Sequence, residues 1–213
     1  DPEKGFNNFD KSLKKISQTK LNSKRIELIK VLSSKLDLSS MLYEVFEESI
    51  KNLIGPDALA QKNTNLVIQM PGDENPSEVH RDAPANSPYE IVLWVPLVDC
   101  YKTKSMFIAD IQSTEKSLKK LELNQDWKKF KQFVKNNSHN PSIKYGQALI
   151  FFSGLFHGSE INKEKETRFS LNTRYKNLFS PTGLKNQLQF FKPVRTTKLV
   201  KFGSKIEIKE LLK

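Results

Sequence analysis

Cysteine and arginine are scarce in this 213-residue chain, and long apolar runs are absent. The single cysteine, Cys100, excludes an intramolecular disulfide and a zinc site built from several cysteines. The longest apolar stretches, Ile91 to Val98 and Ala148 to Phe152, fall far short of the roughly 18 residues that a membrane-spanning helix needs. No basic segment followed by an apolar one marks the N-terminus for secretion, so we expect a cytoplasmic protein that does not enter a membrane.

The shortage of arginine also limits what the positive charge can mean. The chain has a net charge of +11, but nearly all of its basic residues are lysines, spread over the N-terminal third, the 116–135 segment and the C-terminal tail. Because arginine forks usually carry base and phosphate recognition, a nucleic-acid-binding domain is the less favoured interpretation. Steering of an anionic small molecule fits the charge better.

The hydrophobic pattern changes character along the chain. Between residues 11 and 54 apolar residues recur at helical spacing, which predicts two or three helices that end at Gly55-Pro56. A further helical turn is predicted at 57–61, and from residue 65 onward short β-rich runs, one of them at 155–161, alternate with turn-forming clusters. Helices followed by many short strands, without regular β-α-β alternation, favour an α+β protein with a β-sandwich or jelly-roll core.

We therefore expect one domain spanning residues 1–213. Its C-terminal stretch mixes apolar residues with lysines, and the pattern leaves three alternatives open: covering a sheet edge, closing over a site, or forming a homodimer contact. The predicted parts are a mainly helical layer (1–64), a jelly-roll core (65–180), a helical insertion within that core (113–134) and a C-terminal extension (181–213).

Two of the three histidines occur in a pattern typical of a metal site. His80 and Asp82 are two residues apart, so in an extended segment their side chains point to the same side. His157 follows the apolar run 148–156, from which a neighbouring strand would present a third ligand at the same point. Two imidazoles and one carboxylate on one face of an ion are the ligand set of non-haem Fe(II) oxygenases.

An arginine follows the second histidine at an informative distance. Arg168, Ser170 and Asn172 share one face of a predicted strand by period two. A buried arginine needs an anionic partner, and a guanidinium with a hydroxyl two residues on suits one carboxylate of a dicarboxylate cosubstrate. The chain thus predicts a metal site and an anion site close together.

These motifs resemble those of 2-oxoglutarate- and Fe(II)-dependent oxygenases of the phytanoyl-CoA dioxygenase-like group. The similarity covers residues 65–177, about half the chain, in the order that the family has them. The matching segments are His80-Arg81-Asp82, the strand 91–97, the run 146–153 leading to His157-Gly158, and Arg168-Phe169-Ser170.

The resemblance implies a fold, a reaction and a set of binding residues. It implies a double-stranded β-helix of the cupin type, with iron held by His80, Asp82 and His157. Arg168 and Ser170 would hold 2-oxoglutarate, with Gln69 helping from the preceding strand. Such an enzyme uses O2 and releases succinate and CO2 while it oxidises its substrate, most simply by hydroxylation.

The substrate class is a looser expectation. A second similarity, to small oxygenases of bacterial carbohydrate and aminoglycoside pathways, favours a small-molecule substrate such as a sugar or sugar conjugate. Residues that flank the proposed ligands, or share a strand face near them, are the candidates for substrate contact: Arg81, Glu90, Trp94, Asn172 and Arg174.

Other interpretations of the same residues remain open. One is a metal-binding cupin without oxygenase activity, such as an isomerase or a binding module. In a purely structural interpretation His80 lies in a loop, His157 is a core histidine, and Arg168 pairs with a carboxylate such as Glu160. Only the oxygenase explains why an arginine and a serine follow the second histidine at this offset.

Overall fold

Three helices open the described part of the chain. The computed structural model describes residues 16–82, 87–123, 126–183 and 187–211. Where a range predicted from the sequence includes other residues, that part of the prediction lies outside the described residues. At the start of the second helix the Asp37 carboxylate accepts a hydrogen bond from the Ser40 amide at 3.2 Å. Gly55 ends the third with φ at +86°, a conformation that favours glycine. The prediction of two or three helices is confirmed by α2 (Gln18–Lys35), α3 (Leu38–Val45) and α4 (Glu47–Ile54).

The larger of two antiparallel sheets is built around one long strand, β8 (Arg168–Asn177). The sheet order is β6-β3-β8-β1-β9, and β2 also pairs with β8, beside the half of that strand that precedes the part paired with β1. The other strands are β1 (Ala58–Gln61), β2 (Asn65–Gln69), β3 (Ile91–Pro96), β6 (Leu149–Phe152) and β9 (Phe191–Arg195).

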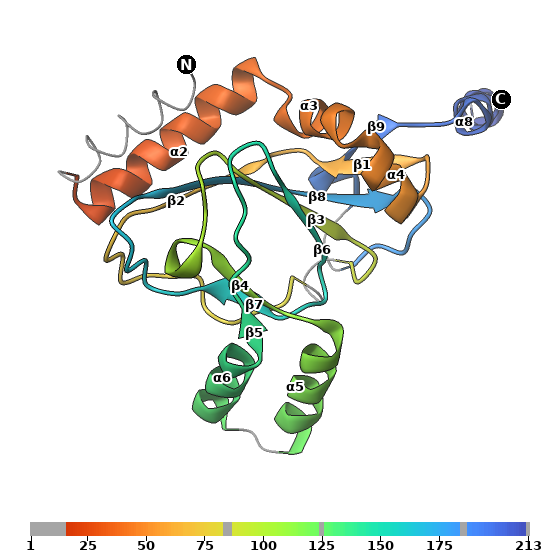
Figure 1. The fold of residues 1–213 in the computed structure, drawn as a ribbon. Helices are drawn as coiled ribbons and strands as arrows, with labels where there is room; N and C mark the ends of the chain where they lie inside the picture. The colour runs from red at the N-terminus through yellow and green to blue at the C-terminus, as the bar shows by residue number, and fades with distance from the viewer. Residues whose placement is uncertain (1–15, 83–86, 124–125, 184–186, 212–213) are drawn as a thin grey trace.

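The two faces of β8 have different chemistry. Phe169, Leu171 and Tyr175 pack in apolar clusters with residues of the N-terminal helices, so α2, α3 and α4 form a layer over this face (Figure 1). Because side chains alternate along a strand, Arg168, Ser170, Asn172 and Arg174 occupy the opposite face. The helical layer thus takes up the apolar face of the strand, and the polar face is turned toward the second sheet.

The smaller sheet has the order β5-β4-β7 and faces the larger one. Val92 and Trp94 of β3 share an apolar cluster with Met106 and Ile108 of β4, which joins the two sheets on their inner faces. Its strands are β4 (Met106–Ala109), β5 (Ser138–His139) and β7 (His157–Ser159), and a short 3-10 turn (Lys102–Lys104) precedes β4.

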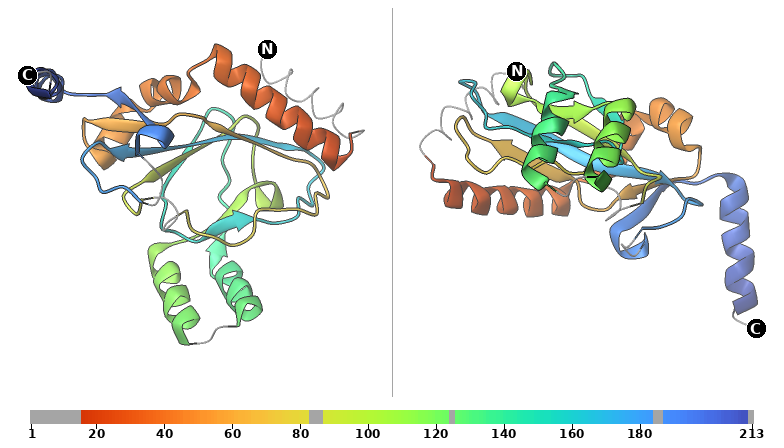
Figure 2. Two further views of the ribbon diagram at one scale, coloured as in Figure 1. Left: turned by 180° about the vertical axis from the view of Figure 1, so that it is seen from behind. Right: turned by 90° about the horizontal axis from the view of Figure 1, so that it is seen from below.

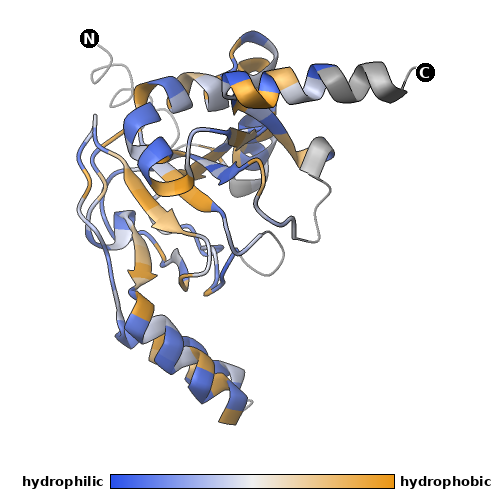
Figure 3. Ribbon diagram, turned by 90° about the vertical axis from the view of Figure 1, so that its right-hand side faces the viewer, coloured by the Kyte–Doolittle hydropathy of each residue, from blue (hydrophilic) through white to orange (hydrophobic). Residues whose placement is uncertain are grey.

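A helical hairpin extends from the smaller sheet between β4 and β5. It consists of α5 (Ile111–Leu123) and α6 (Trp127–Asn136) and points away from the sheets (Figures 1 and 2). Hydrophilic and hydrophobic residues alternate along both helices in Figure 3. Phe130 and Val134 pack against Ala109 and Phe156, so the apolar side of α6 anchors the hairpin to the smaller sheet.

The C-terminal segment completes one edge of the larger sheet. After α7 (Gln187–Phe190), strand β9 pairs with β1, which agrees with the sheet-edge alternative among the three that the sequence left open. Helix α8 (Lys198–Leu211) then leads away from the sheets (Figures 1 and 2). None of the helices among the described residues is long and apolar enough to cross a membrane.

Two local predictions are wrong. The helical turn expected at 57–61 is instead β1, because Ala58 and Ala60 are fully buried and the segment pairs with β8 on one side and β9 on the other. The strand expected at 155–161 is shorter, at 157–159, where pairing with β4 sustains it. The predicted combination of helices with antiparallel sheets is confirmed.

Candidate active site

The three residues predicted to bind metal come together between the two sheets. His80 and His157 form an antiparallel bridge, with amide-to-carbonyl distances of 3.0 and 2.9 Å. One possible ligand atom from each of His80, Asp82 and His157 lies within 4.8 Å of the others. Asp82 is fixed by its amide, which donates to the Ser153 carbonyl at 3.0 Å. Arg81, which lies between His80 and Asp82 in the sequence, has its guanidinium carbon 5.2 Å from the centroid of the Phe156 ring.

Hydrogen bonds to backbone carbonyl oxygens orient both imidazoles. His80 Nδ1 lies 2.7 Å from the Glu78 carbonyl, and His157 Nδ1 lies 2.9 Å from the Leu155 carbonyl. A carbonyl oxygen only accepts, so each Nδ1 carries a proton and Nε2 is the nitrogen that each ring leaves for a metal. His80 Nε2 lies 4.0 Å from an Asp82 carboxylate oxygen. The two rings thus offer the tautomer that binds a metal through Nε2.

Burial keeps His157 in the neutral form. Burial, together with the neighbouring His80, lowers the pKa of His157 to about 4. The imidazole therefore carries no proton on Nε2 at neutral pH. Two imidazole nitrogens and one carboxylate oxygen fit a divalent first-row metal such as Fe(II).

A buried arginine holds the Asp82 carboxylate. Arg174 Nη2 and Nε donate to the two carboxylate oxygens at 2.7 and 3.2 Å, and its Nη1 donates to Gln61 Oε1 at 3.0 Å. Burial raises the pKa of the Asp82 carboxyl, but the hydrogen bonds and charge of Arg174 outweigh it, so the net pKa lies below its ordinary value. Asp82 is therefore ionised and fixed in orientation, as a metal ligand must be.

Replacing Arg174 tests this support. Arg174→Met leaves the Asp82 carboxylate buried without its cation, which is expected to destabilise the fold by about 3–5 kcal/mol and weaken metal binding about 10- to 100-fold. Arg174→Lys keeps the charge but not the two-pronged contact and should recover only part of the affinity. Calorimetric titration with Co(II) measures both variants, and wild-type affinity in Arg174→Met would show that Arg174 does not position the ligand.

Gly158 lets the His80 segment lie directly on β7. A Cβ atom at Gly158 would come within 2.9 Å of the Ser77 and Glu78 carbonyl oxygens and 2.6 Å of the Phe107 ring. The Glu78 carbonyl is also the acceptor that orients His80. A side chain at this position would therefore displace the backbone that carries the first ligand.

We expect Gly158→Ala to misalign His80. The added methyl group has no room, so the cost in unfolding free energy should be about 1–3 kcal/mol, with metal affinity about tenfold lower. Gly203→Ala is the matched control because no atom lies within 4 Å of a Cβ there. Thermal unfolding and metal titration compare the two, and equal behaviour would refute a steric role for Gly158.

A second group of buried polar side chains, on β8 and the neighbouring β2, contains a cation and several atoms without hydrogen-bond partners among the described residues. Arg168 and Gln69 are cross-strand partners, so their side chains share a face, and they are only 5% and 3% exposed. Within the described part of the chain, Arg168 donates from Nη2 to Ser159 Oγ at 2.9 Å, while its Nε and Nη1 have no partner. Gln69 Oε1 and Ser170 Oγ also lack partners among these residues. Since buried polar atoms are normally paired, these groups indicate a ligand.

Arg168 remains a cation in this setting. Burial lowers the pKa of the guanidinium to about 10, which still leaves it protonated at neutral pH. Among the described residues its side chain donates to the neutral Ser159 hydroxyl, and the structural alternative in which it pairs with Glu160 is not observed. The Asp73 charge helps to hold the proton on Arg168, and the N–H groups of the guanidinium that remain unpaired favour an anionic ligand.

The residues proposed to contact substrate differ in which groups they contact in the structure. Asn172 Oδ1 is unpartnered on the same strand face as Ser170, and Trp94 lies opposite Asn172 but belongs to the apolar cluster between the sheets. Glu90 is buried and accepts from the Ser87 amide at 2.7 Å. Arg174, as described, is bound to Asp82 rather than free to meet a substrate.

Ser159 and Gln61 are site residues that the sequence did not indicate. Ser159 holds Arg168, and Gln61 completes the contacts of Arg174. Ser159 follows His157 by two residues on one strand, so the period of two would have identified it. Gln61 comes from a segment expected to be helical and gave no such signal.

Comparison with known proteins gives likeness in structure only. No family model matches the sequence, and no curated protein matches it. Among solved structures, the non-heme monooxygenase ThoJ in complex with nickel is 19% identical, with a TM-score of 0.52 over 70% of this chain and 56% of that one. EctD from S. alaskensis, in its apoform, is 14% identical with a TM-score of 0.51, over 70% and 56%.

A third solved structure matches over a longer stretch. SnoK, a non-heme alpha-ketoglutarate-dependent carbocyclase from nogalamycin biosynthesis, is 12% identical with a TM-score of 0.51 over 86% of each chain. The chain has the fold of these non-heme enzymes. It spans just over half the length of ThoJ and EctD. At such identities the likeness concerns the fold, and the chemistry must be argued from the site itself.

Proposed function

We propose that this protein is an Fe(II)- and 2-oxoglutarate-dependent oxygenase. The observation that carries the proposal is the contact between Arg168 and Ser159, because Ser159 lies two residues after His157 on the same face of β7. Residues so related are about 6.7 Å apart along a strand. That spacing is on the order of the length of a five-carbon dicarboxylate reaching from the metal ligand to the guanidinium.

Each part of the site has a task in this proposal. His80, Asp82 and His157 hold the metal, which with bound 2-oxoglutarate supplies O2 activation coupled to release of succinate and CO2. Arg174 keeps Asp82 ionised and oriented. Arg168 remains protonated and neutralises the far carboxylate of the cosubstrate.

Arg168 and the neutral side chains beside it, Ser170 and Gln69, would together bind that carboxylate. The two unpartnered N–H groups of Arg168 and the unpartnered Ser170 hydroxyl are donors that a carboxylate accepts from directly. Gln69 is already fixed, because its Nε2 donates to the Glu160 carbonyl at 2.6 Å. Burial of these groups excludes water, which strengthens their interaction with an anion.

The finer features of the reaction are part of the same proposal. The two facing sheets would be the halves of a double-stranded β-helix, and the segment order favours the phytanoyl-CoA dioxygenase-like group. We propose hydroxylation of a small-molecule metabolite, with a sugar or sugar conjugate as the first class to screen. Asn172, with its unpartnered oxygen, is the best placed of the substrate candidates.

The experiment that tests the function follows the cosubstrate. Protein reconstituted with Fe(II) is given 2-oxoglutarate labelled at C1 in air. Labelled CO2 is counted, and unlabelled succinate is quantified by chromatography, with and without candidate substrates. An oxygenase releases the two products in equal amounts, faster when a true substrate is present. Iron binding without any decarboxylation across the screen would instead favour a metal-binding cupin of another activity.

A further inference from the structure

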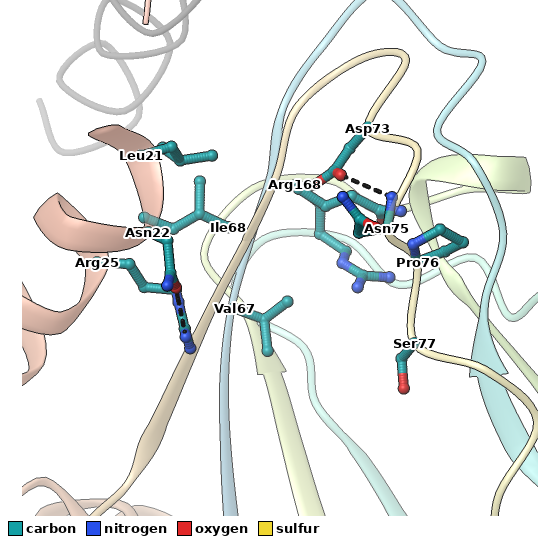
Figure 4. A pocket seen from close by; sticks show the side chains of 11 residues that line it. Leu21, Asn22, Arg25, Val67, Ile68, Asp73, Asn75, Pro76, Ser77 and Arg168 are labelled. Atoms are coloured by element: carbon teal, nitrogen blue, oxygen red, sulfur yellow. Dashed lines mark hydrogen bonds between the residues drawn. The ribbon is translucent and has the colours of Figure 1, made fainter. Parts of the chain in front are cut away.

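A cavity of about 460 Å³ opens at the edge of the larger sheet, between α2, β2 and the 73–77 segment (Figure 4). Its outer part includes Asn22 and Asn75, which are exposed, and its inner part includes Arg168 and Gln69, which are almost fully buried. The volume falls in the usual range of small-molecule sites. The cavity therefore leads from the protein surface to the proposed carboxylate-binding groups.

The inner end of the cavity is chemically suited to an anion. Arg168 brings a positive charge and two N–H groups without partners, and Gln69 lies beside it. Farther out, Arg25 is held at the wall by two hydrogen bonds to Asn22 Oδ1, at 2.8 and 3.2 Å. The lining thus carries two guanidinium groups and one carboxylate, that of Asp73, and this excess of positive charge attracts an anion.

The cavity does not lead past the metal group. Among the described residues that line it, none is His80, Asp82 or His157. The His80 side chain has its own exposure to solvent, at 42%, whereas that of Asp82 is 8% exposed. The metal end and the carboxylate end of the site are therefore reached from different parts of the surface.

We propose that this cavity is the passage through which 2-oxoglutarate reaches Arg168 and succinate leaves. The inference rests on the proposed function and adds a route to it. A substrate bound at the metal then leaves the cosubstrate opening clear. Cosubstrate exchange is consequently independent of substrate size.

Narrowing the passage tests the route. Asn22→Trp places a large ring at the mouth, on an exposed turn of α2, and Ser23→Trp is the matched control on the neighbouring exposed position. Anaerobic stopped-flow mixing of the Fe(II) protein with 2-oxoglutarate follows the visible charge-transfer absorption of the complex. A barrier in a passage slows association and dissociation equally, so we expect both rate constants to fall about tenfold in Asn22→Trp with Kd unchanged.

A second variant changes charge rather than width. Asp73→Asn keeps an oxygen for the hydrogen bond from the Asn75 amide, which is 3.0 Å long, and removes the negative charge from the passage. Association should become roughly threefold faster at low salt, and less so at high salt.

The outcomes separate this inference from the function on which it rests. Unchanged rate constants in Asn22→Trp, in a protein whose wild type binds 2-oxoglutarate, would overturn the passage and leave the proposed function intact. Equal slowing in Ser23→Trp would also overturn it, because that ring lies outside the cavity lining. Absence of any 2-oxoglutarate binding in the iron-loaded wild type would overturn both.

Discussion

Asp82→Ala is expected to remove metal binding at the candidate site, lowering affinity by roughly three orders of magnitude. Asp82 is the only carboxylate in the group with His80 and His157, and it is buried and ionised beside Arg174. Without it the two neutral imidazoles have no negative charge to set against a divalent ion, and the charge of Arg174 repels that ion. Calorimetric titration with Co(II) and with Fe(II) under argon measures the loss.

The third histidine provides the control for this prediction. His139 lies exposed in β5, outside the candidate group, so His139→Ala should bind metal as the wild type does. His157→Ala should resemble Asp82→Ala, with circular dichroism confirming that each variant is folded. Metal affinity that survives in both Asp82→Ala and His157→Ala would place the metal elsewhere.

Arg168→Gln is expected to weaken 2-oxoglutarate binding by at least about 100-fold while leaving metal affinity unchanged, since two charge-assisted hydrogen bonds contribute about 1.5–3 kcal/mol each. The replacement keeps a polar side chain but removes the buried charge and the donor to the Ser159 hydroxyl. Arg168→Lys restores the charge without the planar fork and should recover affinity only in part. Equilibrium titration of the iron-loaded protein with 2-oxoglutarate gives the three dissociation constants.

A surface arginine makes the comparison specific. Arg195 is exposed and pairs with Glu47 at 3.5 Å, far from the polar face of β8, so Arg195→Gln should leave both constants unchanged. Wild-type 2-oxoglutarate affinity in Arg168→Gln would mean that another group holds the cosubstrate. Loss of metal affinity in the same variant would indicate a structural rather than a binding role.

The sequence predicted the ligand group because short-range geometry governs it. His80 and Asp82 need only an extended backbone to converge, and Arg168 and Ser170 need only the alternation of one strand. The apolar run before His157 indicated a strand that brings this histidine to the other two residues. In the structure His80 and His157 are paired by an antiparallel backbone bridge. Local periodicity thus predicted which face of its strand each side chain occupies, and pairing between strands determined which side chains come together.

Contacts between distant segments were beyond the sequence. Arg174 looked like a substrate residue because it lies on the same face as Arg168, yet 92 positions separate it from Asp82, with which it pairs. The segment 57–61 has no strong strand pattern of its own and becomes β1 only because it fits between β8 and β9. Tertiary pairing decided both cases, and a single sequence does not display it.

The central claim is that metal and 2-oxoglutarate bind together at this site, and one titration tests it most directly. Wild-type protein is loaded with Fe(II) without oxygen, and 2-oxoglutarate is then added while the visible spectrum is recorded. We predict a metal-to-ligand charge-transfer band that saturates at one equivalent of cosubstrate and fails to form in Asp82→Ala. A wild-type protein that binds iron at His80, Asp82 and His157 but shows no such band would contradict the account.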